Sequence, residues 1–286
     1  MNDQLPIRGL WSSRAALFSL LLILTSLFLH RIFYLPTPTL FLCLGFGYIL
    51  AVFALIVGIV AGVGIWQNRA QGAARVFLGC CVGCGIGIIP LLLFLHAKNF
   101  PFINDVTTNT SDPPLFKVLG QERTSGAANP SVYPFSHFAS QQYEAYPDLI
   151  SLKINRSLQD TFDLVVDTLR RLQMRIVSIE APSETSPEGR IEAVNRTLVV
   201  GFYNDLSLRV RGTPTTAVID LRSSSRYGKS DFGYNAQLIR SVMRELLIKL
   251  GTGGASTSVE SSEPRQPPLP AKQQKNGSPK KGEADR

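Results

Sequence analysis

The chain contains few of the residues on which catalytic and metal sites depend. It has four cysteines and three histidines in 286 residues, and only His137 lies outside the hydrophobic N-terminal third. The cysteines all lie within hydrophobic runs, at Cys43, Cys80, Cys81 and Cys84. A disulfide framework in the rest of the chain is therefore excluded. One CxxC spacing occurs without a nearby histidine or carboxylate, so we expect no metal and no cofactor.

Motifs of the common catalytic chemistries are also missing. No G-x-S-x-G sequence is present, so the nucleophile elbow of many serine hydrolases is absent. Residues 228–230 (GKS) match only the end of a P-loop, because Ser223 stands where the first glycine is required. Residues 231–233 (DFG) spell the kinase metal triplet without a catalytic loop or a glycine-rich strand. These absences argue against nucleotide chemistry, and an enzyme is not the favoured interpretation.

A strong charge of one sign is absent from most of the chain. Basic and acidic residues number 6 and 1 in residues 1–100, 17 and 16 in residues 101–250, and 6 and 4 in residues 251–286. The net charge of +8 therefore arises mainly beside the hydrophobic runs, where basic residues influence membrane topology. A nucleic-acid-binding domain needs a basic patch of its own, so we expect no nucleic-acid partner.

Three long hydrophobic runs occupy the first third of the chain. They cover about residues 15–35, 39–66 and 76–95, and each approaches or exceeds the roughly 20 residues with which a helix crosses a bilayer. The first run is longer than the apolar part of a signal peptide, and no A-x-A site follows it, which favours an uncleaved helix. Residues 1–98 are thus predicted to be a membrane region in contact with the lipid bilayer.

Basic residues predict the orientation of these helices. Arg8 and Arg14 precede the first run, Arg69 and Arg75 lie between the second and the third, and Arg31 alone lies between the first and the second. The positive-inside rule then places the N-terminus in the cytoplasm and the C-terminal part outside. We expect a multi-pass protein of the bacterial inner membrane with a periplasmic or external domain.

Small residues recur at four-residue intervals in two of the runs. Gly58 and Gly62 lie in the second, and Gly79, Gly83 and Gly87 lie in the third. Such rows let a second helix approach closely within a membrane. The partner is either another helix of the same chain or a second copy, so self-association is an open alternative.

The part outside the membrane divides by composition. Residues 99–148 are predicted to be an extended arm or connector that packs partly on the domain, because they are rich in aromatic residues as well as in turn formers. Within this arm, residues 105–108 and 112–114 resemble polar turns. Residues 251–286 are rich in Gly, Ser, Pro, Lys and Gln, and are predicted to be a disordered tail.

Periodicity predicts the fold of residues 149–250. Alternating apolar residues indicate a strand at 150–154, and helical spacing after a cap at Ser157 indicates an amphipathic helix. Four more strands at 175–181, 190–200, 205–211 and 216–223 precede a helix at about 234–250. This order predicts an α+β domain of two layers, with both helices on the apolar face of a mainly antiparallel sheet. The opposite, charged face, which carries Glu192, Arg209 and Asp220, would meet solvent, the arm or a partner.

Several short motifs together resemble one family. They are residues 190–193 (RIEA), 220–226 (DLRSSSR), 228–231 (GKSD) and 235–236 (NA). This set is similar to the signature of the DUF1499 family, a domain of unknown function, over roughly residues 102–250. The resemblance implies a domain that can be joined to membrane helices, and it implies no activity.

The candidate site is the corner between the last strand and the last helix. Arg222, Arg226 and Lys229 supply positive charge there, and guanidinium groups beside a helix start suit a carboxylate or phosphate. The remaining candidate residues of this corner are Ser225, Ser230, Asp231 and Asn235. The alternative is that the arginines pair with carboxylates such as Asp220, Asp231 or Glu192 and lock the fold.

Three functional hypotheses follow. The leading one is a membrane-anchored envelope protein whose external domain binds a partner or an anionic ligand. The second is a hydrolase that uses Ser225 or Ser230 of the serine-rich loop with His137 and Asp231. The third is a structural membrane-assembly protein that acts through its glycine-rich helices.

Overall fold

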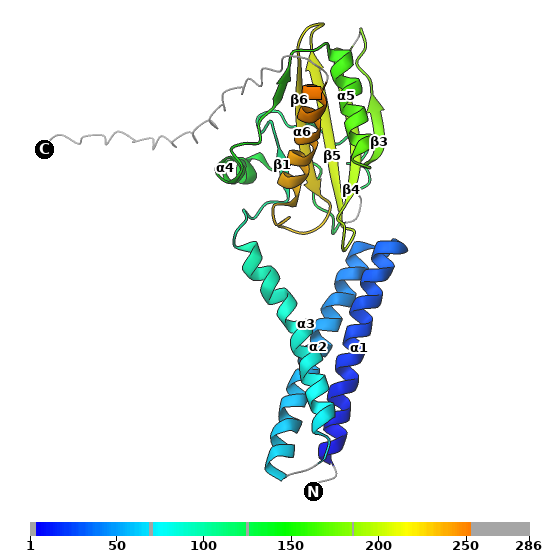
Figure 1. Cartoon of the computed structure of the whole chain (residues 1–286), viewed down its shortest axis with the longest axis vertical. Helices are drawn as coiled ribbons and strands as arrows, with labels where there is room; N and C mark the ends of the chain where they lie inside the picture. The colour runs from blue at the N-terminus through cyan, green and yellow to red at the C-terminus, as the bar shows by residue number, and fades with distance from the viewer. Residues whose placement is uncertain (1–3, 69–70, 124–125, 185, 253–286) are drawn as a thin grey trace, which may run out of the picture.

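A computed structural model describes residues 4–68, 71–123, 126–184 and 186–252 of the chain. Figure 1 shows three long helices that lead to a domain made of one sheet and its helices. The predicted tail lies outside the described residues, except for Gly251 and Thr252, which end the last helix.

The three hydrophobic runs form the helices α1 (Gln4–Ile32), α2 (Thr37–Asn68) and α3 (Ala73–Ala97). All three are long and apolar enough to cross a membrane, which confirms the predicted membrane region. Serine hydroxyls fasten α1 to α2, since Ser12 Oγ donates to the Ala54 carbonyl at 2.8 Å and Ser19 Oγ donates to the Gly47 carbonyl at 2.7 Å. These bonds satisfy polar groups that lipid cannot satisfy.

The glycine rows serve packing within the chain. A Cβ atom at Gly79 would lie 2.2 Å from Ser12 Oγ, and one at Gly58 would lie 2.6 Å from Cys80 Sγ. At Gly83 it would lie 3.2 Å from the Ala51 carbonyl oxygen, whereas at Gly87 nothing lies within 4 Å. Close approach of the chain's own helices therefore accounts for Gly58, Gly79 and Gly83.

The domain is built on one antiparallel sheet. Its strands are β1 (Asp105–Thr107), β2 (Leu152–Ile154), β3 (Arg175–Glu180), β4 (Glu188–Arg196), β5 (Tyr203–Gly212) and β6 (Ala217–Ser225). The order is β1-β6-β5-β4-β3, and β2 also pairs with β6. The helices are α4 (Phe135–Ala145), α5 (Leu158–Arg171) and α6 (Tyr234–Thr252). The predicted α+β fold with an antiparallel sheet is confirmed.

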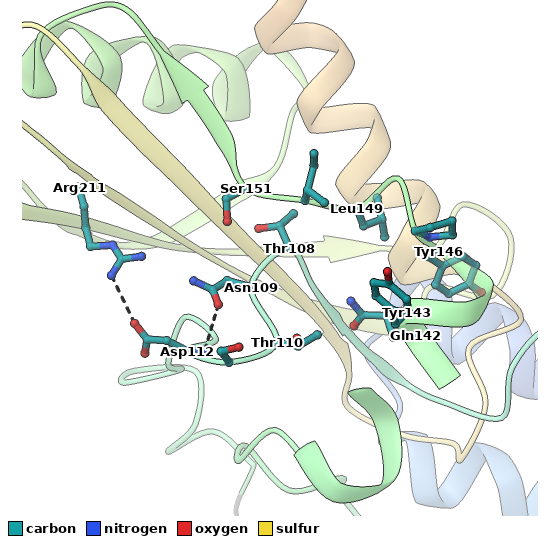
Figure 2. A pocket seen from close by; sticks show the side chains of 13 residues that line it. Thr108, Asn109, Thr110, Asp112, Gln142, Tyr143, Tyr146, Leu149, Ser151 and Arg211 are labelled. Atoms are coloured by element: carbon teal, nitrogen blue, oxygen red, sulfur yellow. Dashed lines mark hydrogen bonds and ion pairs between the residues drawn. The ribbon is translucent and has the colours of Figure 1, made fainter. Parts of the chain in front are cut away.

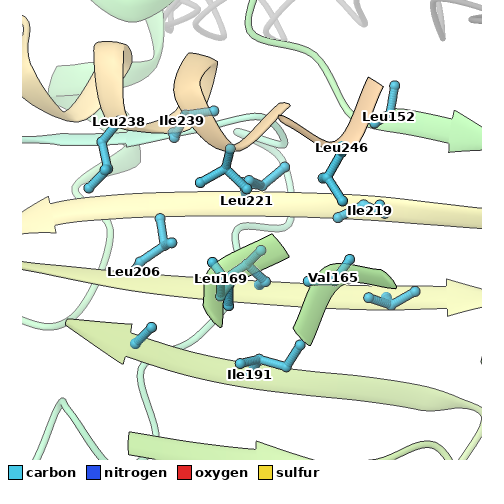
Figure 3. Packing of buried hydrophobic residues seen from close by; sticks show 14 of the residues in the cluster. Leu152, Val165, Leu169, Ile191, Leu206, Ile219, Leu221, Leu238, Ile239 and Leu246 are labelled. Atoms are coloured by element: carbon cyan, nitrogen blue, oxygen red, sulfur yellow. The ribbon is translucent and has the colours of Figure 1, made fainter. Parts of the chain in front are cut away.

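One face of the sheet carries the hydrophobic core (Figure 3). Val165 and Leu169 of α5 and Leu246 of α6 pack on Leu206 of β5 and Leu221 of β6, and all five are buried. Burial of each such aliphatic side chain contributes about 1.5–3 kcal/mol to stability. The apolar stripe of each helix matches the apolar alternation of the strands, so the two helices cover this face.

Two local predictions were wrong. Residues 105–108 do not form a free turn, because β1 pairs with β6 through Asp105 with Ser224 and Thr107 with Arg222. The strand predicted at 190–200 ends at Arg196, because the Thr197 amide donates to the Phe202 carbonyl and closes a loop. Within the arm, α4 is an unpredicted helix.

The arm covers the charged face of the sheet. The amides of Lys117, Val118 and Leu119 all donate to the Glu192 carboxylate, at 2.6, 3.1 and 2.7 Å. Ser207 Oγ donates to the Leu115 carbonyl at 2.9 Å. The charged face, which was expected to meet solvent, the arm or a partner, is therefore covered by the arm.

Candidate functional site

Arg222 lies on β6 beneath the arm, with its side chain fully buried. Its Nε and Nη2 atoms donate to the two carboxylate oxygens of Asp105 at 3.0 and 2.7 Å. Nη1 donates to the Pro114 carbonyl at 3.1 Å, Nη2 also donates to the Ser131 carbonyl at 2.8 Å, and the guanidinium lies 4.6 Å from the centre of the Phe116 ring. The guanidinium is therefore enclosed by protein acceptors and does not face an open cavity.

The carboxylate partner of Arg222 comes from the arm. Burial raises the pKa of Asp105, and the hydrogen bonds and charge of Arg222 oppose this rise. Paired residues 105 and 222 join β1 to β6 across a sequence separation of 117 positions. The pair therefore fastens the start of the arm to the sheet.

Arg226 is likewise engaged with carboxylates. Its Nε donates to Asp205 Oδ1 at 2.8 Å and its Nη2 donates to Glu122 Oε2 at 2.7 Å. Arg123 of the arm donates from Nε to the other oxygen of Asp205 at 3.0 Å. Asp205 is thus a buried bridge between two arginines, and this cluster holds a second point of the arm.

Ser225, Asp231 and Asn235 belong to a network that starts α6. Ser225 Oγ donates to Asn204 Oδ1 at 2.7 Å, and Asn235 Nδ2 donates to Ser225 Oγ at 3.0 Å. Asp231 accepts the amides of Gly233 and Asn235, both at 2.9 Å. Burial raises the pKa of Asp231, and the two amide donors oppose that rise. These side chains cap the helix and support the corner.

Lys229 and Ser230 lie apart from the buried arginines. Lys229 is exposed, and Ser230 Oγ accepts the Phe232 amide at 3.4 Å. His137 of α4 is exposed, while the hydroxyl of Ser225 is buried and directed to Asn204. The predicted residues therefore do not converge on one concavity, and the arginines pair with Asp105, Asp205 and Glu122 instead of the expected Asp220, Asp231 or Glu192.

A second charged cluster lies where β5 and β6 meet the arm. Asp220 Oδ2 accepts from Nη2 of both Arg209 and Arg211, each at 2.7 Å. Asp112 of the arm accepts from the same two arginines, at 3.0 Å from Arg209 and 3.3 Å from Arg211. Two arginines thus face two carboxylates, so the cluster is locally neutral.

Asp112 and Arg211 of this cluster lie in the wall of an open cavity of roughly 410 Å³ (Figure 2). The other walls come from residues 108–112, from Gln142 and Tyr143 at the end of α4, and from the segment that leads into β2. Gln142 fixes the backbone here, because Thr107 donates its amide to Gln142 Oε1 at 2.9 Å and accepts from Gln142 Nε2 at 2.6 Å. The Asp112 amide donates to Asn109 Oδ1 at 3.0 Å, which positions Asn109 on the wall.

Sequence reasoning missed this cavity. Its residues come from three separate parts of the chain, which are residues 108–112, residues 142–151 and Arg211. Only Arg211 lies within residues 190–236, the region of the short motifs that resemble the family. The only signal was the density of aromatic residues in the arm. Tyr146, one of them, also lines the cavity, and burial raises its pKa to about 12, with the Asp231 carboxylate adding to the rise.

The described residues contain no side-chain cluster that could bind a metal ion. Groups of three or more His, Cys, Asp or Glu side chains that could hold an ion are not found among those residues. The CxxC cysteines Cys81 and Cys84 are exposed on the surface of α3.

Comparison with known proteins identifies the family of the domain. Residues 105–246 match the family model described as a protein of unknown function, DUF1499. No curated protein matches the chain. The match begins at the first residue of β1 and ends within α6, so it includes the arm from Asp105 onward and its arginine partners. The resemblance found in the sequence is confirmed: the domain that follows the three long apolar helices matches the DUF1499 family.

Proposed function

We propose that this chain is a non-enzymatic, membrane-anchored envelope protein whose external domain binds a polar ligand in the cavity of Figure 2. The observation that carries the proposal is this open, polar concavity built jointly by the arm and the sheet. Sites for small molecules are typically concave and place a few polar groups against apolar or aromatic walls. The cavity has this character, and the serine-rich corner does not.

An anion that binds at the predicted corner between β6 and α6 would have to displace the carboxylates that already pair with the arginines there. Arg222 already binds Asp105, and Arg226 already binds Asp205 and Glu122. Removing one partner of a buried pair leaves an uncompensated charge, which costs about 3–5 kcal/mol. The corner is therefore assigned a structural role.

The lining of the cavity favours an uncharged ligand rich in hydroxyl groups, such as a saccharide. Arg209 and Arg211 are balanced by Asp112 and Asp220, so no excess positive charge attracts an anion. Amide and hydroxyl groups line the remaining walls together with the Tyr143 ring. Such groups offer donors and acceptors in similar number, which suits hydroxyl groups that both donate and accept.

Binding is tested with full-length protein in lipid nanodiscs, using saturation-transfer NMR against neutral saccharides and small organic anions. Tyr143→Ala is expected to weaken saccharide binding about tenfold, equivalent to about 1.4 kcal/mol. Phe135→Ala is the matched control, because it lies on the same helix with a similar exposed fraction, 41% against 44%, and does not line the cavity. Equal affinity of the two variants, or a response to anions alone, would contradict the proposed ligand.

The external placement of the domain rests on the basic residues that flank the helices. Alkaline phosphatase joined after residue 252 is expected to be active in a bacterial host, because this enzyme requires the oxidising periplasm to form its disulfides. A green fluorescent protein fused at the same position is the complementary reporter and is expected to be dark. Fluorescence with an inactive phosphatase would place the domain in the cytoplasm and refute the orientation.

A further inference from the structure

The loop between β4 and β5, residues 197–202, carries two adjacent aliphatic side chains that the protein does not cover. Leu198 is 84% exposed and Val199 is 83% exposed. We call this segment the tip loop. Exposed aliphatic pairs at a loop tip are unfavourable in water, so a nonaqueous partner is expected.

The tip loop lies against the end of the α1–α2 pair (Figure 1). Arg31 Nε donates to the Leu198 carbonyl at 3.3 Å, and Arg196 Nη2 donates to the His30 carbonyl at 3.1 Å. The ring of Phe202 lies 5.8 Å from both the His30 ring and the Phe41 ring. The loop is therefore level with the last turn of α1.

The depth of this turn follows from the apolar run of α1. From Ala15 to its end at Ile32, α1 spans about 27 Å, which is close to the roughly 30 Å thickness of a bilayer's hydrocarbon core. Arg31 lies one residue before the end of α1, so the tip loop is level with the boundary of the hydrocarbon core. Beside it the aromatic residues Phe33 and Tyr34 are exposed, as is usual where helices meet the membrane interface.

The loop is rigid and basic. Thr197 Oγ1 accepts the amides of Gly201 and Phe202 at 3.1 and 2.9 Å. Gly201 has φ +86°, and a Cβ atom there would lie 2.7 Å from Arg196 Nη2 and 3.0 Å from Arg31 Cδ. No acidic residue occurs in residues 196–202. The Arg196 guanidinium stacks on the Tyr34 and Tyr203 rings, at 4.8 Å from each ring centre, and the Arg31 guanidinium lies beside the aliphatic pair, where a lipid phosphate would meet it.

We propose that the tip loop is a membrane-inserted anchor, in which Leu198 and Val199 enter the boundary between lipid headgroups and acyl chains. The continuity of the loop with the ends of α1 and α2 identifies lipid as its partner. A second contact point, in addition to α3, fixes the tilt of the domain on the membrane. Arg211 lies eight residues along β5 from Tyr203, so the cavity is held about 26 Å from the tip loop.

The test uses the full chain with its four native cysteines replaced by alanine and one new cysteine carrying an environment-sensitive fluorophore. Leu198→Cys is compared with Thr215→Cys, an exposed position in the turn between β5 and β6 at the opposite end of the sheet. In phosphatidylcholine nanodiscs, the label at 198 is expected to emit at shorter wavelength. It is also expected to be quenched several-fold more strongly than the label at 215 by nitroxide-labelled acyl chains.

Val199→Cys supplies an independent second position and is expected to behave as Leu198→Cys does. Equal quenching at 198, 199 and 215 would overturn the proposal. A blue shift at 198 without quenching by the nitroxide lipid would also overturn it, because protein and not lipid would then cover the loop. Nanodiscs with phosphatidylglycerol distinguish attraction by Arg31 and Arg196 from insertion, since insertion persists in the zwitterionic lipid.

Discussion

Replacing Arg222 by methionine is expected to lower the free energy of unfolding of the domain by about 3–5 kcal/mol. Methionine fills much of the space but leaves the Asp105 carboxylate buried without its cation. The Pro114 and Ser131 carbonyls also lose their donor. The arm then loses its attachment to β6, so the effect is expected to extend to β1.

The matched control is Arg240→Met. Arg240 also makes a two-bond contact to an aspartate, with Nε and Nη2 each 2.7 Å from Asp148, but its side chain is 36% exposed against 0% for Arg222. A pair at the surface contributes about 0.2–1 kcal/mol, so this variant should be nearly as stable as the parent. Because both arginines make two hydrogen bonds to an aspartate, a difference in stability between the two variants reports the effect of burial.

Pulse proteolysis of the full-length protein in urea measures this difference, because it reports on the domain without requiring the membrane helices to unfold. Arg222→Met combined with Asp105→Leu removes both charges and is expected to recover part of the loss. Equal stability of the Arg222 and Arg240 variants would show that the buried pair does not hold the arm.

Gly79→Ala is expected to destabilise the packing of α1 against α3 by about 1–3 kcal/mol. The new Cβ atom would lie 2.2 Å from Ser12 Oγ and 2.9 Å from the Ser12 backbone carbonyl carbon. Rotation of the Ser12 hydroxyl relieves only the first contact, and it also breaks the hydrogen bond to Ala54. The helices must therefore move apart.

Gly87→Ala is the control on the same helix, because its Cβ atom would meet nothing within 4 Å. We expect its effect to stay within about 0.5 kcal/mol. The measurement is the mole fraction of sodium dodecyl sulfate at which energy transfer between labels on α1 and α3 is lost. Identical midpoints for the two variants would mean that the glycine row does not pack these helices.

Several features could be predicted because their causes are local. The three membrane helices follow from the length of each apolar run, and α5 follows from its apolar spacing and from the cap at Ser157, whose Oγ accepts the Asp160 amide at 3.1 Å. The strand β6 and the helix α6 on either side of the serine-rich corner could also be predicted from the sequence. Residues 198–200 misled the strand prediction, because an apolar loop tip has the same composition as a strand end.

Other features depend on pairings across the chain. β1 is only three residues long, and it forms because β6, more than a hundred residues later, supplies its hydrogen bonds. The partner of Arg222 is Asp105, which no periodicity connects to it. The cavity likewise needs the arm, α4 and β5 together.

The amino-acid sequence by itself determined the membrane anchor, the α+β class and the family, because hydrophobic run length, periodicity and short motifs are properties of neighbouring residues. The role of each charged side chain was decided only by the tertiary structure. Whether an arginine binds a ligand or stabilises the fold depends on which carboxylates pair with it and on how far its guanidinium group is exposed to solvent. In this protein the arm brings Asp105 to Arg222 and closes that corner, and it leaves an open polar cavity beside Asp112 and Arg211.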